Sequence, residues 1–137
     1  MSRIFIRGAG AVSPAGWGVT ALCNALAQKQ PLPVIDLPCP GKNQALKVRR
    51  VPAPPSRPGF AAHPRLRRTS PIGQYATAAA LEALGSEVAR VGKGSSGLGI
   101  VYCAMSGCVN FSRRFYDETL KNPATASPVI FPETVFN

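Results

Sequence analysis

Apolar residues recur at helical spacing between residues 19 and 28 (VTALCNALAQ). Offsets of three and four place the larger apolar side chains on one face, which predicts an amphipathic helix. Gly18 precedes the pattern and the Gln30-Pro31 step follows it, so we expect the helix to begin and end there. The residues on the apolar face are Val19, Leu22, Cys23 and Leu26.

Two further helices are predicted downstream. Residues 69–84 are rich in alanine, Ser70 can cap their first turn, and Pro71 suits the first helical position. Gly85 is expected to end this helix. Residues 109–121 follow a Ser-Gly turn and end before an Asn-Pro step, which predicts a third helix.

Two apolar runs predict β-strands. Residues 4–6 precede a glycine-rich turn, and residues 98–105 (LGIVYCAM) are apolar almost throughout, as is typical of a strand covered on both faces. Helices separate the two runs along the chain. We therefore expect 4–6 and 98–103 to be neighbouring strands of one mainly parallel sheet, with the 69–84 helix packed on it.

Residues 31–68 are rich in proline, glycine and basic residues. Short extended pieces are expected at 34–37 and 45–48, and the remainder is interpreted as ordered loop, with a disordered linker as the alternative. The resulting order β-α-loop-α-β-α indicates an α/β layered domain. Two strands and three helices would leave the edges of its sheet open.

The chain is apolar enough to form a core and strongly basic. Apolar residues make up 45% of the chain, enough for a core, while 16 Lys and Arg against 6 Asp and Glu give a net charge of +10. Half of the basic residues fall between Lys42 and Arg68, and this patch favours an acidic partner: nucleic acid, an anionic membrane or an acidic carrier protein. No apolar run approaches the roughly 18 residues of a membrane-spanning helix, and residues 1–7 are no secretory signal, so we expect a cytoplasmic protein without a membrane span.

Few residues are candidates for catalysis or metal binding. His63, the single histidine, lies in the proline-rich loop. Ser106 and Cys108 follow an apolar run, where nucleophiles of α/β folds lie, yet no histidine base adjoins them in sequence. The cysteines lack the close pairs of zinc sites and are expected to be free, mostly buried thiols. They are Cys23, Cys39, Cys103 and Cys108.

Four blocks of the sequence occur in an order that is found in one enzyme family. They are RIFIRGAGAVSPAGWGVTALCNALAQKQ, RLRRTSPIGQYATAAALEALG, LGIVYCAMSGCVNFSRRFYDETL and SPVIFPETVFN. Together they resemble the opening of the β-ketoacyl-(acyl-carrier-protein) synthases, condensing enzymes of the thiolase fold. The resemblance implies that residues 1–137 are the incomplete N-terminal half of the thiolase-like layered α-β-α fold, with a basic Pro-rich loop at 31–68 and the remainder of the fold absent.

This resemblance also implies an activity for the parent protein. It would catalyse the decarboxylative Claisen condensation of an acyl thioester with a malonyl-type carrier thioester, in fatty acid or polyketide synthesis, without a metal or other cofactor. Family members place the nucleophilic cysteine and two catalytic histidines beyond the segment that ends here at Asn137. None of the cysteines of this chain matches the nucleophile, so the chain alone is expected to be inactive.

The resemblance assigns binding roles to three groups of residues. Arg67 and Arg68 match basic residues that dock the acidic acyl carrier protein. Many family members also have basic residues where this chain has residues 124–126 (ATA). Because those basic residues are missing here, the expected docking of the carrier protein shifts toward the Lys47-Arg49-Arg50 cluster. Ser106, Gly107 and Cys108 match the turn that lines the acyl channel in the family. The family's dimer-contact region is matched by Phe131, Thr134, Phe136 and Asn137.

The resemblance implies a homodimer, or a heterodimer with a partner ketosynthase. The isolated chain is expected to self-associate through an apolar end that holds Val129, Ile130, Phe131, Val135 and Phe136. Two alternatives stay open. One is a non-catalytic subunit of the chain-length-factor kind, in which the nucleophile is replaced. The other is a basic nucleic-acid-binding module, although the basic run lacks the interleaved aromatic residues of such modules.

Overall fold

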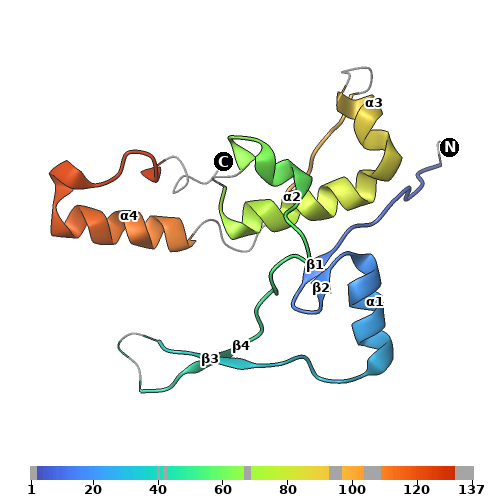
Figure 1. Ribbon diagram of the computed structural model, residues 1–137. Coiled ribbons are helices and arrows are strands. Elements are labelled where there is room, and N and C mark those ends of the chain that lie inside the picture. The colour runs from blue at the N-terminus through green and yellow to red at the C-terminus, as the bar shows by residue number, and fades with distance from the viewer. Residues whose placement is uncertain are drawn as a thin grey trace.

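The computed structural model describes residues 3–39, 41, 43–66, 69–92, 97–103 and 109–131 (Figure 1). The α-helices in these ranges are α1 (Val19–Gln28), α2 (Pro71–Leu84), α3 (Val88–Gly92) and α4 (Val109–Lys121). The strands are β1 (Val12–Ser13), β2 (Gly16–Trp17), β3 (Ile35–Leu37) and β4 (Leu46–Val48). Short 3₁₀ turns occur at Gly59–Ala62, Gly85–Glu87 and Pro123–Thr125.

The three predicted helices are confirmed as α1, α2 and α4. Helix α1 ends at Lys29, whose left-handed backbone (φ 53°) stops the helix ahead of the proline. Helix α2 begins as expected, because the Ser70 side chain accepts a hydrogen bond from the backbone N–H of Gly73 and Pro71 occupies the first helical position. Gly85 follows α2 with a positive φ of 50°, a conformation that glycine adopts without strain.

The two extended pieces expected in the proline-rich region are confirmed as β3 and β4. They pair with each other in an antiparallel hairpin, in which Ile35 lies opposite Val48 and Leu37 opposite Leu46. The sequence predicted the extended backbone of each piece but not this pairing. The Arg49-Arg50 pair directly follows β4.

The strands predicted at 4–6 and 98–103 are wrong at the level of the described structure. Both segments lack strand pairing, and the sheets that are described are two separate antiparallel pairs, β1 with β2 and β3 with β4. The glycine-rich turn that follows the N-terminal run lies against α2: a Cβ atom at Gly8 or Gly10 would overlap the carbonyl oxygen of Ala83 or Ala79. A helix cannot supply ladder hydrogen bonds, because its own backbone groups are already paired within the helix.

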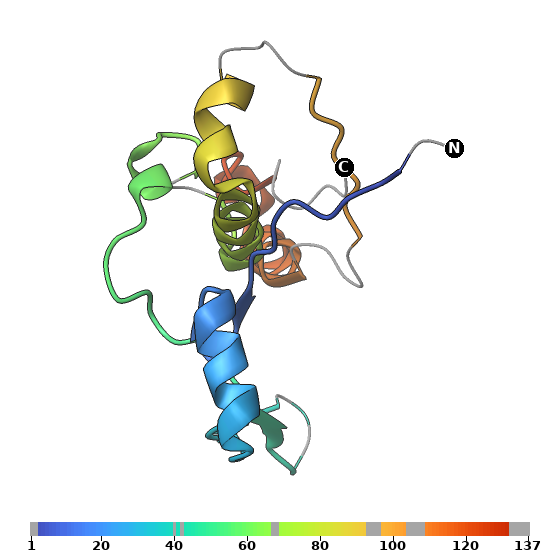
Figure 2. The same cartoon turned by 90° about the vertical axis from the view of Figure 1, so that its right-hand side faces the viewer.

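Little of the chain is buried. Among the described residues, Ile130 and Ser70 are the ones that fall in the buried class, and the elements extend in different directions from α2 (Figures 1 and 2). The chain exposes 11298 Å², whereas a compact protein of this mass exposes about 6,800 Å². The expected burial of the thiols is wrong for Cys23 and Cys103, which are exposed, because there is so little core to hold them.

Two other expectations concern burial and membrane crossing. Ile130 was expected in an exposed apolar end, yet it is buried, with 6% of its surface exposed. No helix in the described ranges has the length and apolar character needed to cross a bilayer.

Candidate functional site

Most of the residues to which the sequence assigned binding roles fall outside the described ranges. These are Arg67, Arg68, Ser106, Gly107, Cys108, Thr134, Phe136 and Asn137. Phe131 is described: its side chain is 54% exposed, and its ring centroid lies 5.5 Å from that of Phe115 in α4. This residue therefore packs partly on its own chain.

The described residues form a groove that includes Arg49 and Arg50 of the Lys47-Arg49-Arg50 cluster. The groove has a volume of about 660 Å³ and lies between the β3–β4 hairpin, the first turns of α2 and the first turn of α4. We call it the basic groove, and its lining comprises Leu37, Val48, Arg49, Arg50, Val51, Ser70, Pro71, Ile72, Tyr75, Val109, Asn110 and Phe111.

The charge of the basic groove comes from two adjacent arginines. The side chain of Arg49 donates from Nε to the backbone oxygen of Leu32 at 3.3 Å, which directs it along the loop before β3. Arg50 makes no hydrogen bond or ion pair within the described part of the chain. Among the described residues that line the groove none is acidic, so these residues do not neutralise its positive potential.

A single tryptophan holds the arginine-bearing segment against α2. The indole Nε1–H of Trp17 donates to the backbone oxygen of Pro52 at 2.8 Å, two residues after Arg50. The same ring meets Tyr75 of α2 edge to face, with centroids 5.6 Å apart and planes at 82°. Trp17 thus links β2, the segment after β4 and the wall of the basic groove.

A carboxylate clasp fixes the hairpin that carries Trp17. Oε2 of Glu82 accepts from the backbone N–H of Ala11 at 2.9 Å, and Oε1 accepts from that of Val19 at 2.8 Å. Helix α1 has no side-chain cap of its own, so Glu82 of α2 caps it from a distant part of the sequence. The clasp joins β1, α1 and α2 into one unit.

Sequence reasoning missed both Trp17 and Glu82. The available signal was the start of α1 at Gly18, because a helix that begins without Ser, Thr, Asp or Asn must have its first N–H groups satisfied from elsewhere. Nothing in the sequence identifies which of the six acidic residues does so. The role of Trp17 could not be predicted either, because its partner Pro52 is 35 positions away in the sequence.

The C-terminal helix contains a second carboxylate with more than one partner. Glu118 accepts from the backbone N–H of Ser127 at 3.1 Å and from Nε of Arg114 at 2.9 Å. The hydrogen bond from Ser127, followed by that from Arg114, lowers the pKa of the Glu118 carboxyl below its ordinary value of 4.5. Glu118 thereby holds the 3₁₀ turn after α4 against the helix.

The described lining of the groove is cationic and partly apolar. His63 follows the 3₁₀ turn at Gly59–Ala62 and lines neither the basic groove nor the second cavity beside α2. In the described ranges, no three His, Cys, Asp or Glu side chains gather closely enough to hold a metal ion. What the geometry provides is a cationic and partly apolar surface that can receive an anion with an apolar part.

Comparison of the chain with models of known protein families, with curated proteins and with solved structures finds no match.

Proposed function

We propose that this chain is the N-terminal part of a condensing enzyme of the β-ketoacyl-(acyl-carrier-protein) synthase kind, and that its own share of the work is to dock the acidic acyl carrier protein. The observation that carries the proposal is the Arg49-Arg50 pair in a partly apolar groove without acidic residues. The four ordered sequence blocks support the choice of family. The thiolase-like α-β-α fold is part of the proposal.

The proposed docking uses both components of the groove. Guanidinium groups bind carboxylates through paired hydrogen bonds, and unneutralised positive charge speeds the approach of an acidic protein. Val48, Val51 and Phe111 supply apolar wall beside the charge. An acidic helix with one or two apolar side chains would satisfy both features at once.

In the reaction proposed for the whole enzyme, a cysteine thiolate takes the acyl group from a carrier thioester and releases the carrier thiol. Loss of CO₂ from a malonyl-type thioester then gives an enolate, whose carbon attacks the acyl-enzyme and expels the thiolate. Two histidines would stabilise the enolate oxygen. No residue between 1 and 137 is given these roles, so we propose that the chain binds the carrier and does not condense it. The reaction would take place in the cytoplasm.

A charge-reversal titration tests the docking. A fluorescent acyl carrier protein is titrated with the full chain and with the Arg50→Glu variant, which should bind at least about tenfold more weakly. Lys121→Glu is the matched control, because it makes the same charge change at the far end of α4, about 18 Å along the helix from the groove. Equal weakening in both variants, or none in either, would refute docking at the groove.

A single-stranded nucleic acid is the second candidate ligand. The basic run lacks interleaved aromatic residues in sequence, but the structure brings Tyr75 and Phe111 into the same groove as the two arginines. Aromatic rings beside cations suit stacked bases and phosphates. Binding of oligothymidylate that falls steeply with salt and depends on both Arg50 and Phe111 would favour this function over carrier docking.

A further inference from the structure

The β3–β4 hairpin has one apolar face and one charged face. Side chains alternate along a strand, so residues two apart share a face, and residues paired across the strands share it too. Asp36 pairs with Lys47 on the charged face, where the opposite charges attract each other. The remaining paired positions are all apolar and lie on the other face. We call this the hairpin face, and it consists of Ile35, Leu37, Leu46 and Val48.

The hairpin face continues into the basic groove. Leu37 and Val48 belong to the face and also line the groove, in which Arg49 and Arg50 lie as well. The other two members of the face, Ile35 and Leu46, are 41% and 52% exposed. In Figures 1 and 2 the hairpin lies at the lower end of the molecule, where it leaves this face open to a partner. The groove and the face therefore form one surface with a cationic part and an apolar part.

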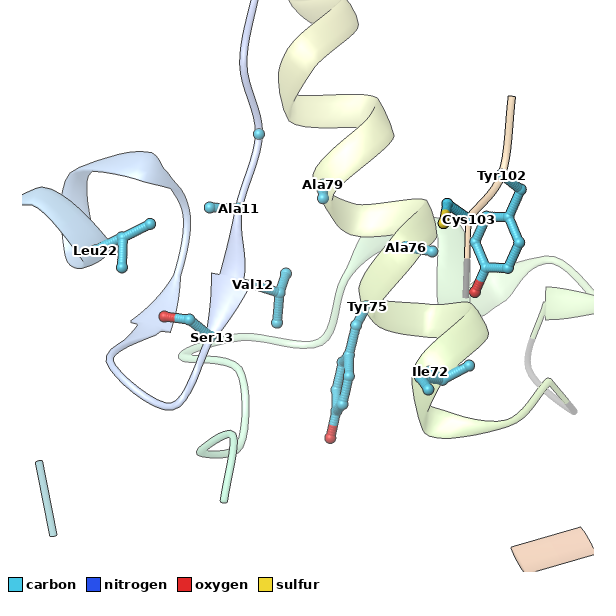
Figure 3. Close-up of a pocket in the computed structure, with 11 residues that line it drawn as sticks. Ala11, Val12, Ser13, Leu22, Ile72, Tyr75, Ala76, Ala79, Tyr102 and Cys103 are labelled. Atoms are coloured by element: carbon cyan, nitrogen blue, oxygen red, sulfur yellow. The ribbon is translucent and has the colours of Figure 1, made fainter. Parts of the chain in front are cut away.

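The charge of the basic groove determines where an acidic partner binds. The second cavity beside α2, shown in Figure 3, has a volume of about 560 Å³ and no charged residue in its described lining. Small side chains of α2, including Ala76 and Ala79, border it. Two arginines line the basic groove, and none of its described lining is acidic. Acidic side chains are therefore attracted to the groove, which brings them beside the hairpin face.

The same charge disfavours a second copy of this chain as the partner. A second copy would bring a further net charge of +10 to the contact. Its helix α4 has exposed apolar side chains at Tyr116 and Leu120, but it carries Arg113 and Arg114 beside them. Like charges brought close together across an interface are destabilising. The charges therefore favour an acidic partner of a different sequence.

The spacing of the hairpin face fits one side of a helix. Ile35 and Leu37 are two positions apart on a strand, which separates them by about 6.6 Å. Side chains four positions apart on a helix are separated by about 6 Å. Two apolar side chains on successive turns of one helix can therefore contact both strand residues together. Acidic residues next to them on the helix would then reach the arginines of the groove.

We propose that the hairpin face and the basic groove together bind an amphipathic helix that carries acidic residues beside two apolar residues on successive turns. This inference rests on the proposed function, in which that helix belongs to the acyl carrier protein. Arg49 and Arg50 attract the acidic residues, and the hairpin face covers the apolar ones. The hairpin face then determines specificity, because a surface that is only acidic gains nothing from contact with it.

A threonine double variant tests the hairpin face. Ile35→Thr combined with Leu46→Thr removes apolar surface but keeps residues that favour strands. With unchanged helicity, this variant should bind a fluorescent acyl carrier protein at least about tenfold more weakly than the wild type. Val34→Thr is the matched control, since Val34 is 45% exposed and alternation directs it away from the hairpin face. It should bind the carrier protein as the wild type does.

Salt separates the two parts of the surface. The loss caused by the double variant should be the same at low and high salt, because it comes from apolar contact. The loss caused by Arg50→Glu should shrink as salt rises, because salt screens charges. Carrier binding that depends on Arg50 but is unchanged in the double variant would overturn this inference and leave carrier docking in place.

Two synthetic helical peptides separate the inference from the identity of the partner. Both carry glutamates, and the first has leucine at two positions four apart where the second has serine. By fluorescence anisotropy, the first should bind the full chain at least about tenfold more tightly than the second. It should lose this advantage in the double variant. This result with a carrier protein that does not bind would support the hairpin face and reject the proposed function.

Other occupants of the hairpin face would give different results. Equal binding of the two peptides, or of neither, would overturn the inference. Self-association of the chain that the double variant abolishes would assign the face to a second copy. Binding to phosphatidylglycerol vesicles that the double variant abolishes, while peptide binding is unchanged, would assign it to a lipid surface. Either of these last two results would also overturn the inference.

Discussion

Two regions of the molecule are held together in different ways. The clasped region comprises β1, β2, α1 and α2, and its bonds from Glu82 and Trp17 join residues 71, 63 and 35 positions apart. The C-terminal arm comprises α4 and the residues that follow it to Phe131, and the side-chain and turn hydrogen bonds described for it between residues 109 and 130 span nine positions or fewer. In Figure 1 the arm extends beyond the N-terminal end of α2.

This difference indicates which region can form alone. The arm contains its own turn and its own stabilising partners, so it is expected to open and close independently of the rest. The clasped region requires distant segments to meet before any one of them is stable. The basic groove lies where the two regions approach, because α2 and α4 both contribute their first turns to it.

The largest loss of stability is expected when the hydrogen bonds of Glu82 are removed. Glu82→Ala removes the acceptor for the backbone N–H groups of Ala11 and Val19, and with it the side-chain cap at the N-terminus of α1. It should cost about 2 kcal/mol of the free energy of unfolding. Urea unfolding followed by fluorescence of the single tryptophan, which lies in the clasped region, measures this loss. Glu87→Ala is the matched control, since it breaks only an exposed ion pair with Arg90. Similar losses in the two variants would show that Glu82 is not a clasp.

A smaller effect should separate the indole hydrogen bond from the aromatic contact. Trp17→Phe keeps a ring near Tyr75 but removes the donor to Pro52, and should cost about 1 kcal/mol. It should also weaken carrier binding, because the Arg49-Arg50 segment loses its anchor to α2. The helicity of the arm should stay unchanged by NMR. A loss of stability confined to the arm would contradict the division into two regions.

These two residues also mark the limit of what the sequence predicts. The helices follow from apolar spacing and from local start and stop signals such as Ser70 and Gly85, all within a few positions of the element concerned. The partners of Glu82 and Trp17 are too distant in sequence for any local pattern to contain them. The pairing of β3 with β4 escaped prediction for the same reason.

The two wrong strand predictions have a different cause. Residues 4–6 and 98–103 have the apolar composition of buried strands, but composition does not show whether another strand lies beside them to accept their backbone hydrogen bonds. The exposed thiols follow from the same shortage of covering layers. Of the residues predicted to bind partners, the structure describes Phe131 and the Lys47-Arg49-Arg50 cluster. Arg49 and Arg50 of this cluster line the groove.

The exposed end of the arm gives a test of self-association. Val129 is 64% exposed and Phe131 packs on Phe115, so Val129→Asp and Phe131→Asp should both weaken self-association, by about tenfold. Only Phe131→Asp should also destabilise the arm, by about 1 kcal/mol, through the lost ring contact. Light scattering and helicity measure the two effects separately. Unchanged association in both variants would exclude this end as the contact.

The smallest expected effect is the pH dependence that Glu118 gives to the stability of the arm. The Ser127 N–H, and after it Arg114, hold the pKa of Glu118 below its ordinary value of 4.5 in the folded arm. A carboxyl whose folded pKa is lowered contributes stability that is fully present above its unfolded pKa and is lost as the pH falls through its folded pKa. The turn after α4 should therefore loosen on acidification below pH 4.5, while the wild-type arm at neutral pH keeps the full contribution.

Glu118→Gln should remove this pH dependence from the amide exchange of Ser127. Asp117→Asn, which removes a longer ion pair of 3.8 Å with Arg113, should leave the pH dependence in place. Equal pH dependence in wild type and Glu118→Gln would show that the turn is held by contacts other than this carboxylate.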